Sequence, residues 1–533
     1  MGIYLNPGKE KFGRALRSQI YVDKTGLLAY TNSVLDSEQS YICVSRPRRF
    51  GKSMTAEMIA AYYDKSCESG DFFDSMNIAK TSGYKEHLNQ YDVIHVDMND
   101  FRHRFNSETG NTVSAMEAVE LFHSEIISEM KELYPSAINE QMHGLPTVLA
   151  NVNKVYGSSF IIIIAEWDTI FREDKNDTKA QEAYITLLRG LFKDAPSKKF
   201  LKLAYMTGIL PIKKYGTESA LNNFKEFTML NPGRLTEYVG FTEKEVESLC
   251  SKYQMDFEEV KRWYDGYSFR KESHIYNPNS VVNAMLDEEY NNYWTNTETF
   301  ESLKDYICMD FNGLKDDVLK MLSGNRVQID VNSFENDMVN FKNRDDVLTV
   351  LVHLGYLAYD TDTAETYIPN NEVKAVFLTA IRNSSWDTVV NAITLSDKLL
   401  TATLQKQEKT VAEIIDQVHM ENTSILQYND ENSLSCVITL AYYNAMNDYV
   451  MIRELPTGKG FADIVFLPKR HSDKPALVVE LKFEQSAEGA ITQIKEKKYA
   501  NALKGYRGNV LLVGINYSKD TKEHTCRIED LQY

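Results

Sequence analysis

Short apolar runs alternate with helix-period stretches along the amino-terminal part of the chain. A continuous apolar run is typical of a strand buried on both faces, whereas apolar residues three or four positions apart are typical of an amphipathic helix. We expect strands at 41–44, 93–97, 160–164 and 201–206, and a long helix at 112–134. Strands that alternate with helices predict an α/β fold with a parallel sheet covered on both faces.

The middle of the chain has a different pattern. Residues 300–345 are helical and charged, and an amphipathic helix at 347–357, a hairpin made of 356–359 and 366–368, and a helix at 371–381 follow them. Helix, two-stranded wing and helix resemble a winged-helix lid. Because the segment is not basic, we expect it to pack against a neighbouring domain rather than to read DNA.

Beyond residue 405 the pattern changes again. A helix at 434–447, strands at 460–467 and 476–483, a helix at 487–503 and a strand at 510–513 predict an α-β-β-α-β unit. We therefore expect three domains. These are an α/β domain at 1–290, a helical and winged-helix-like region at 291–404, and a second α/β domain at 405–533.

Composition narrows the functional classes. Of the 533 residues, 43% are hydrophobic and 25% are charged, as is ordinary for a soluble globular protein. No apolar run reaches the roughly 18 residues of a membrane span, and the amino terminus has neither a secretory nor a myristoylation signal. The six cysteines are scattered without metal-binding spacing. We expect a cytoplasmic protein with no membrane partner and no zinc site.

The charge is distributed unevenly. A net charge of −17 argues against a protein that coats DNA. Between 481 and 527, however, nine Lys or Arg residues stand against five Asp or Glu residues, a local excess of 9 − 5 = +4. Any contact with nucleic acid should therefore lie near the carboxyl end.

The clearest motif joins the first strand to the helix after it. From Arg46 the sequence runs Arg-Pro-Arg-Arg-Phe-Gly-Lys-Ser, and its Gly-Lys-Ser opens a helix. In a phosphate-binding loop the backbone amides and the helix N-terminus hold the anion, the lysine reaches the β- and γ-phosphates, and the serine hydroxyl holds magnesium. Here Arg46 stands where the motif has its first glycine. The residues that we expect to bind ATP and Mg²⁺ are Arg46, Pro47, Arg48, Arg49, Phe50, Gly51, Lys52, Ser53 and Met54.

Two strand ends add polar groups to this site. The third strand runs into Ala165-Glu166-Trp167-Asp168, where phosphate-loop NTPases carry an acid for magnesium and often a Glu that polarises the attacking water. Glu166 suits the second role, Ala165 occupies the magnesium position, and Asp168 is a weaker substitute for it. Alternatively, Glu166 and Asp168 cap the next helix. Thr207, at the end of the fourth strand, is either a sensor of the γ-phosphate or a turn residue.

A second set of polar residues lies in the carboxyl-terminal unit. Asp463 lies at the start of one strand, and Glu480 and Lys482 share one face of the next strand. Two carboxylates suit a hard divalent cation, Mg²⁺ or Mn²⁺, and a lysine beside them would orient water and stabilise charge on phosphorus. This pattern predicts a metal-dependent phosphodiesterase.

Three further residues could extend that second site. Gln493 and Tyr499 lie on the following helix, near lysines that could contact phosphate. Glu431, at the start of the preceding helix, is a candidate third acid. It could equally be a helix-start charge that the helix dipole favours.

Taken together, the motifs resemble a bacterial family that joins an AAA-ATPase-like domain to a carboxyl-terminal nuclease domain of the PD-(D/E)XK superfamily. Motifs that match this family are spread over nearly the full length, at 21–25, 46–53, 207–211, 263–267, 353–356, 368–372, 460–463, 480–482 and 493–499. The resemblance accounts for Arg46, since the family has arginine there. It also implies that Ala165 replaces an aspartate of the family, so we expect ATP to bind and to turn over slowly.

These observations predict an ATP-gated, magnesium-dependent DNA endonuclease, with a role in defence against foreign DNA or in mobile-element biology. RNA is the alternative substrate. The rival function is a nucleotide-dependent switch or scaffold whose nuclease-like domain only binds nucleic acid or protein; Ala165 and the overall acidity favour it. A homo-oligomer is a further expectation, because AAA-type ATPases often use a neighbour's arginine, and Arg48, Arg49 and Arg234 are candidates.

Overall fold

The structure is a computed structural model with side chains. It describes residues 2–531 apart from 107–109, 140, 141, 143, 196, 213, 216, 217, 220, 270, 271, 295–298, 336, 337, 385, 423–436, 440, 444, 446, 447, 457–460, 470–473 and 498–507. The chain divides into two compact units, one made of 1–299 with 327–376 and the other of 300–326 with 377–533. The α/β class expected from the sequence is confirmed in both.

A five-stranded parallel sheet forms the centre of the first unit, in the order β2-β5-β6-β1-β9. Its strands are β1 (Tyr41–Ser45), β2 (Asp92–Asp97), β5 (Phe160–Ala165), β6 (Leu201–Gly208) and β9 (Lys225–Phe227). All six residues of β5 are buried, as its continuous apolar sequence predicts for a strand covered on both faces. The four strands expected from the sequence are present, and β9 is an addition.

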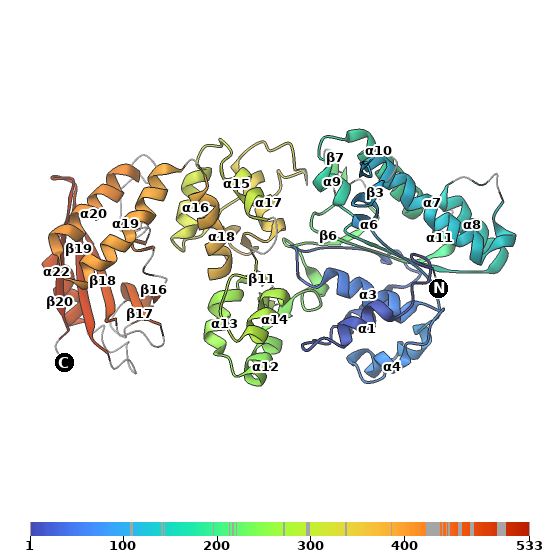
Figure 1. Cartoon of the computed structure of the whole chain (residues 1–533), viewed down its shortest axis with the longest axis horizontal. Helices are drawn as coiled ribbons and strands as arrows, with labels where there is room; N and C mark the ends of the chain where they lie inside the picture. The colour runs from blue at the N-terminus through green and yellow to red at the C-terminus, as the bar shows by residue number, and fades with distance from the viewer. Residues whose placement is uncertain are drawn as a thin grey trace. The chain divides into compact units, whose positions relative to one another are not determined.

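Helices cover both faces of this sheet (Figure 1). On one face lie α1 (Glu10–Leu16) and α3 (Lys52–Tyr63), and on the other lie α7 (Ala115–Leu133), α8 (Leu145–Tyr156), α10 (Thr178–Phe192) and α11 (Ser197–Phe200). The expected long helix is α7, which a capping box of Ser114 and Glu117 begins. Shorter elements connect these parts: α2 (Gly26–Val34), α4 (Gly70–Phe73), η1 (Asn77–Lys80), α5 (Tyr84–His87), α6 (Met98–Arg102), β3 (Phe105–Asn106), β4 (Asn111–Thr112), η2 (Pro135–Ala137), α9 (Thr169–Glu173), β7 (Lys214–Tyr215), β8 (Glu218–Ser219) and η3 (Gly233–Leu235).

Two three-stranded antiparallel sheets also belong to the first unit. One has the order β10-β12-β11 and packs with α12, α13 and α14; its elements are β10 (Phe241–Thr242), α12 (Glu243–Tyr253), α13 (Phe257–Tyr264), β11 (Tyr267–Phe269), β12 (Glu272–Tyr276) and α14 (Pro278–Asp287). The other belongs to a helix-and-wing segment, the wing element, made of β13 (Val327–Gln328), α17 (Arg344–Leu354), β14 (Ala358–Asp360) and β15 (Glu365–Tyr367). The helix α18 (Asn371–Arg382) follows it. The expected hairpin is β14–β15, and β13 adds a third strand.

The second unit combines helices with a mixed sheet, in the order β16-β17-β18-β19-β20. Its helices are α15 (Thr299–Ile307), α16 (Leu314–Leu322), α19 (Asp387–Leu404), α20 (Glu408–Asn422) and α22 (Ala487–Glu496). Its strands are β16 (Tyr449–Pro456), β17 (Phe461–Pro468), β18 (Ala476–Phe483), β19 (Val510–Ser518) and β20 (Glu523–Asp530). The strands β18 and β19 are parallel, and the other neighbours are antiparallel.

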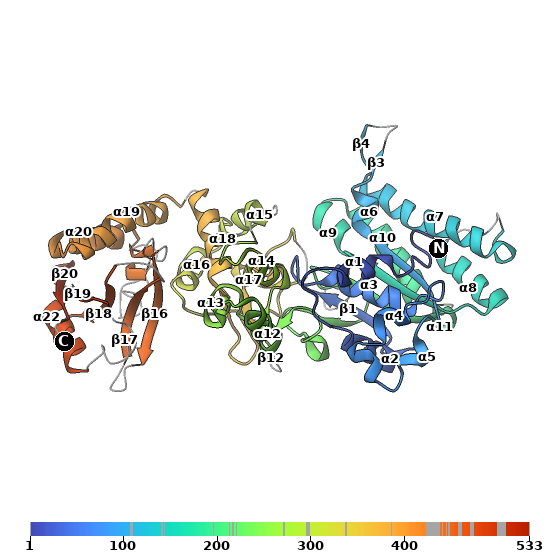
Figure 2. The ribbon, with the colours of Figure 1, turned by 60° about the horizontal axis from the view of Figure 1, so that its bottom comes forward.

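Each face of the mixed sheet has its own core. The helices α19 and α20 lie along one face, and α22 lies on the other (Figure 2). Gly514 of β19 lets α22 approach closely, since a Cβ added there would lie 2.4 Å from the carbonyl oxygen of Ala487. The expected strands at 460–467, 476–483 and 510–513 are β17, β18 and β19, whereas the sequence pattern did not indicate β16 or β20.

Candidate functional site: two polar centres at strand ends

The phosphate loop connects β1 to α3 at the carboxyl edge of the central sheet. Because β1, β5 and β6 are parallel, their carboxyl ends meet at this edge, where Ser45 pairs with Gly208 and Ala165 pairs with Thr207. Gly51 precedes α3 with φ +89°, a conformation that favours glycine. A Cβ added at Gly51 would meet no atom within 4 Å, so the loop curves around open space. This space and the helix N-terminus fit a bound phosphate.

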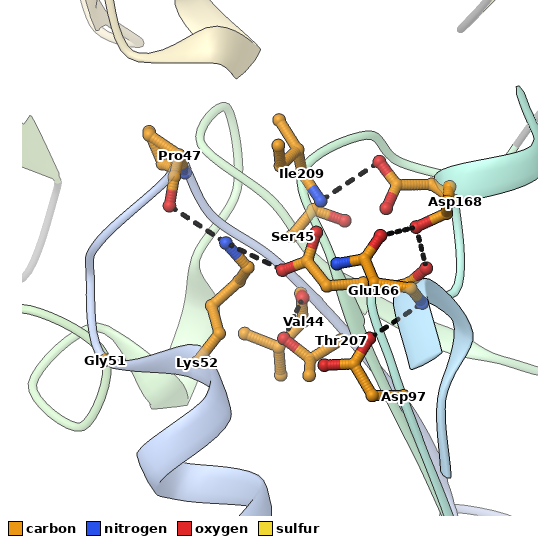
Figure 3. Close-up of polar contacts among 12 residues, drawn as sticks. Val44, Ser45, Pro47, Gly51, Lys52, Asp97, Glu166, Asp168, Thr207 and Ile209 are labelled. Atoms are coloured by element: carbon orange, nitrogen blue, oxygen red, sulfur yellow. Dashed lines mark hydrogen bonds and ion pairs between the residues drawn. The ribbon is translucent and has the colours of Figure 1, made fainter. Parts of the chain in front are cut away.

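Lys52 points into the site and is almost buried. Its Nζ donates to the carbonyl oxygen of Pro47 at 3.0 Å and forms an ion pair with Glu166 Oε1 at 3.5 Å (Figure 3). The other carboxylate oxygen of Glu166 accepts from Arg172 at 2.9 Å. Burial by itself would raise the pKa of Glu166, but the charges of Lys52 and Arg172 outweigh it and hold the pKa below its ordinary value. Glu166 is therefore ionised and lies beside the lysine that the motif assigns to phosphate.

The other loop residues differ in their exposure. Arg46 is fully buried, and its guanidinium donates to the carbonyl oxygens of Ser45 and Phe227, each at 2.9 Å. Burial lowers the pKa of Arg46 to about 10. The structure thus places the Arg46 side chain on the backbone beneath the loop, where it supports the loop. Pro47 and Phe50 are buried, Arg48 is half-buried, and Arg49, Ser53, Met54 and Arg234 are exposed.

Asp168 and Thr207 bind backbone groups. The buried Asp168 carboxylate accepts from the amides of Ile209 at 3.1 Å and Leu210 at 2.8 Å, and pairs with Arg172 at 3.0 Å. The Thr207 hydroxyl donates to the carbonyl oxygen of Val44 at 3.0 Å (Figure 3). Both side chains therefore tie the end of β6 to its neighbours.

The structure adds Asp97 to this site. It ends β2 and pairs with Ala165 in the parallel register, so the two side chains share one face of the sheet. Burial, together with the nearby charge of Glu166, raises the pKa of Asp97 to about 6. Its carboxylate also accepts from the amide of Asn99 at 2.9 Å. In the sequence Asp97 was visible as a strand-end acid, but its position beside Ala165 depends on the strand order.

The second centre lies where β17 and β18 pair. Ile464 pairs with Val479 in the antiparallel register, so Asp463 and Glu480, the next residue on each strand, both lie on the same side of that pair. Asp463 Oδ2 accepts from the amide of Leu481 at 2.7 Å, which fixes this carboxylate against β18. The structure thus brings together the two acids that the sequence pattern selected.

Glu480 is buried among polar partners. It is 1% exposed, its Oε1 accepts from Lys482 Nζ at 3.2 Å and also from the Gln493 amide on α22. Burial, with the negative charge of Asp463, raises the pKa of Glu480 to about 7. The second oxygen, Oε2, is buried and has no hydrogen-bond partner among the residues that the structure describes. A buried carboxylate oxygen without a donor, next to a second carboxylate, fits a divalent cation.

Two residues predicted for the second centre, Glu431 and Tyr499, lie outside the described residues. Within the described part, no three His, Cys, Asp or Glu side chains gather into a metal-binding group. No helix in the described ranges is long and apolar enough to span a membrane.

Two family models match the chain. Residues 10–217 match the model described as a predicted AAA-ATPase, AAA-ATPase_like, and residues 429–525 match the model of the PD-(D/E)XK nuclease superfamily. Over 298 residues the chain is 22% identical to an uncharacterized protein in the vnfD 5′ region of Azotobacter chroococcum mcd 1, a match that covers 52% of this chain and 51% of that protein. The chain therefore spans about half the length of the curated relative that it matches.

Solved structures show weaker similarity. The ORC2 protein of Aeropyrum pernix, in ADPNP and ADP complexes, has a TM-score of 0.32 at 10% identity, over 69% of this chain and 96% of that chain. The replication initiator DnaA bound to AMPPCP and single-stranded DNA has a TM-score of 0.28 at 11% identity, over 75% of this chain and 97% of that chain.

Proposed function

We propose that this chain, which carries an AAA-ATPase-like domain at 10–217 and a PD-(D/E)XK nuclease superfamily domain at 429–525, is a divalent-metal-dependent DNA endonuclease gated by ATP. The observation that carries the proposal is the convergence of Asp463, Glu480 and Lys482, with the buried Glu480 Oε2 lacking a donor in the described part of the chain. We place the protein in the cytoplasm, with a role in defence or mobile-element biology.

At the second centre each residue has a distinct task. Asp463 and Glu480 would hold Mg²⁺ or Mn²⁺, which when bound activates a water molecule and neutralises phosphate charge. Lys482 would orient that water and stabilise the charge that develops on phosphorus. Gln493 holds the Glu480 carboxylate from α22 and so fixes its direction. The local excess of basic residues in the sequence from 481 to 527 supports a nucleic-acid substrate, DNA in the first place and RNA as the alternative.

At the first centre the loop supports nucleotide binding. Lys52 would exchange its bonds to Pro47 and Glu166 for bonds to the β- and γ-phosphates, and Ser53 would hold magnesium. Glu166, released from Lys52, would polarise the attacking water. Asp97 is the carboxylate beside Ala165 in the strand register, and we assign to it part of the role of the missing aspartate. Because Asp97 lies on the neighbouring strand β2 and not at position 165 of β5, we expect ATP hydrolysis to be slow.

Cleavage assays on the full chain test the nuclease assignment. We expect Glu480→Ala to lower the rate of plasmid cleavage with Mg²⁺ or Mn²⁺ by at least about 100-fold, because even indirect partners of a metal ligand cost about 10- to 100-fold. The matched control is Glu488→Ala, which removes an exposed carboxylate eight residues further along and should cleave at the parent rate.

The same assay separates the proposed function from its rival. Equal cleavage by the parent and Glu480→Ala would show that the site is assigned wrongly. If the parent cleaves none of supercoiled, linear, single-stranded or branched DNA, nor RNA, but still binds ATP, the chain is a nucleotide-dependent switch or scaffold.

A further inference from the structure

Two segments far along the chain pack directly against the phosphate loop. The Phe50 ring meets the Tyr267 ring edge-on, with centroids 5.2 Å apart. Gly355 ends α17 with φ +85°, and a Cβ added there would lie 2.6 Å from both Cβ and Cγ of Pro47. The Tyr267 hydroxyl donates to the Gly355 carbonyl oxygen at 2.6 Å, and this joins the two segments to each other. Tyr267 and Gly355 therefore form one hydrogen-bonded unit that packs against the phosphate loop.

Further contacts connect this hydrogen-bonded unit to the wing element. A Cβ added at Gly266 would lie 2.2 Å from the carbonyl oxygen of Pro369, so β11 and the start of α18 are in close contact. The Tyr367 hydroxyl donates to the Gly266 carbonyl oxygen at 3.0 Å, and the Asn370 amide donates to the Asp265 carbonyl oxygen at 2.6 Å. Three sequence motifs that the proposed chemistry does not use, at 263–267, 353–356 and 368–372, thus meet behind the loop.

The geometry points to Tyr267 and Gly355 as positioning residues of the phosphate loop, through which nucleotide binding at Lys52 is coupled to the wing element. This inference rests on the proposed ATP binding. The contacts to Pro47 and Phe50 flank the residues that would hold phosphate, and they leave no room for the loop to shift without moving Tyr267 or Gly355. Coupling between two sites is reciprocal: if the wing element fixes the conformation of the phosphate loop, ATP bound at the loop must also stabilise the wing element.

Tyr267→Phe is the sharpest test, because it keeps the ring against Phe50 and removes the bond to Gly355. The control is Tyr264→Phe, three residues earlier, which removes a hydroxyl that donates to the Asn291 carbonyl oxygen at 3.0 Å and accepts from the Asn291 amide at 3.1 Å. Hydrogen exchange of 46–53 and 352–357 is measured on the full chain, with and without ATP and Mg²⁺, together with the ATP dissociation constant and the melting temperature.

In the parent and in Tyr264→Phe, we expect ATP to slow exchange at 352–357. In Tyr267→Phe we expect faster exchange at 46–53 without nucleotide, loss of the ATP effect at 352–357, and an ATP dissociation constant raised about fivefold, as the loss of one buried hydrogen bond implies. A merely structural role would lower the melting temperature and leave the ATP effect at 352–357 intact.

Equal ATP protection of 352–357 in Tyr267→Phe and the parent overturns the coupling. Failure of the parent to bind ATP overturns the proposed function and the coupling together. In that case, hydrogen exchange of 46–53 measured without nucleotide still tests whether Tyr267 positions the loop, because this measurement needs no ligand.

Discussion

Single residues decide what the two centres can do, and Ala165 is the most consequential. Its methyl group stands at the end of β5, where the family resemblance implies an aspartate. Asp97 lies beside it in the register, and Glu166 is held between Lys52 and Arg172. In the function that we propose, Lys52 and Glu166 would serve ATP, and Asp97 would be a displaced carboxylate for magnesium. We therefore expect ATP to bind without fast hydrolysis.

Restoring the carboxylate should restore turnover. We expect the parent to release phosphate from ATP more slowly than about 1 per second, and Ala165→Asp to raise that rate about tenfold or more, because a ligand of the metal is returned to its position. Phosphate release at saturating ATP and Mg²⁺ measures both rates. A parent that already hydrolyses ATP at an ordinary rate would contradict the role given to Ala165.

Asp97→Asn tests whether Asp97 takes part of that role. We expect Mg²⁺ to increase ATP affinity less in this variant than in the parent, because one carboxylate beside the magnesium position is lost. Titration of ATP with and without Mg²⁺ gives the ratio of dissociation constants. Asp100→Asn, which changes an acid three residues further on in α6, is the control; the same ratio in Asp97→Asn as in this control would remove Asp97 from the site.

Sequence patterns predicted the residues of each centre that lie close together in the chain. They did not predict contacts between residues that lie far apart in it. Lys52 and Glu166 follow from a loop motif and a strand end, and Glu480 with Lys482 follows from strand alternation, because each of these is encoded within a few residues. Asp97 depends on which strand lies beside β5, and the packing of Tyr267 against Phe50 depends on residues more than two hundred positions apart. No local pattern carries that information.

Among the elements, the start of α18 carries a buried carboxylate. Glu372 is 1% exposed, and its Oε1 accepts from the amides of Tyr293 at 2.8 Å and Trp294 at 3.1 Å. Burial nevertheless raises the pKa of Glu372 to about 7. In the folded chain this group is therefore protonated below about pH 7, whereas in the unfolded chain it ionises at its ordinary, lower pKa.

The stability of the packing at the start of α18 should fall as the pH rises through 7. Because the folded pKa is raised, the stabilisation from Glu372 is complete below the unfolded pKa and is lost as the pH passes the folded one. Between pH 6 and pH 8 we expect a loss of about 1 kcal/mol. Hydrogen exchange of α18 at both pH values, under conditions where exchange reports local stability, measures it.

The matched variant for this pH effect is Glu372→Gln, which keeps the acceptor oxygen for the Tyr293 and Trp294 amides and cannot ionise. Other buried titrating groups, such as His95 and Asp97, are the same in both proteins, so the difference between parent and variant isolates Glu372. A loss of stability between pH 6 and pH 8 that is equal in both proteins would rule out Glu372 as its source.

At the scale of the whole molecule, the chain passes between its two compact units three times. The first unit takes 1–299 and 327–376, and the second takes 300–326 and 377–533. Sequence patterns located the two α/β parts by their strands and helices, but the exchange of segments between units is set by long-range contacts. The helix α18 begins with residues of the first unit and ends with residues of the second. The segment that our inference couples to ATP therefore continues directly into the unit that holds the nuclease centre.

Control of cleavage by ATP can be measured on the intact chain. Plasmid cleavage by the parent and by Lys52→Ala is measured with Mg²⁺ or Mn²⁺, each with and without ATP. We expect the parent to cleave at different rates with and without ATP, and Lys52→Ala to cleave at a single rate that ATP does not change, because its nuclease centre is intact and its phosphate site is not. Cleavage by the parent that is identical with and without ATP would contradict the account.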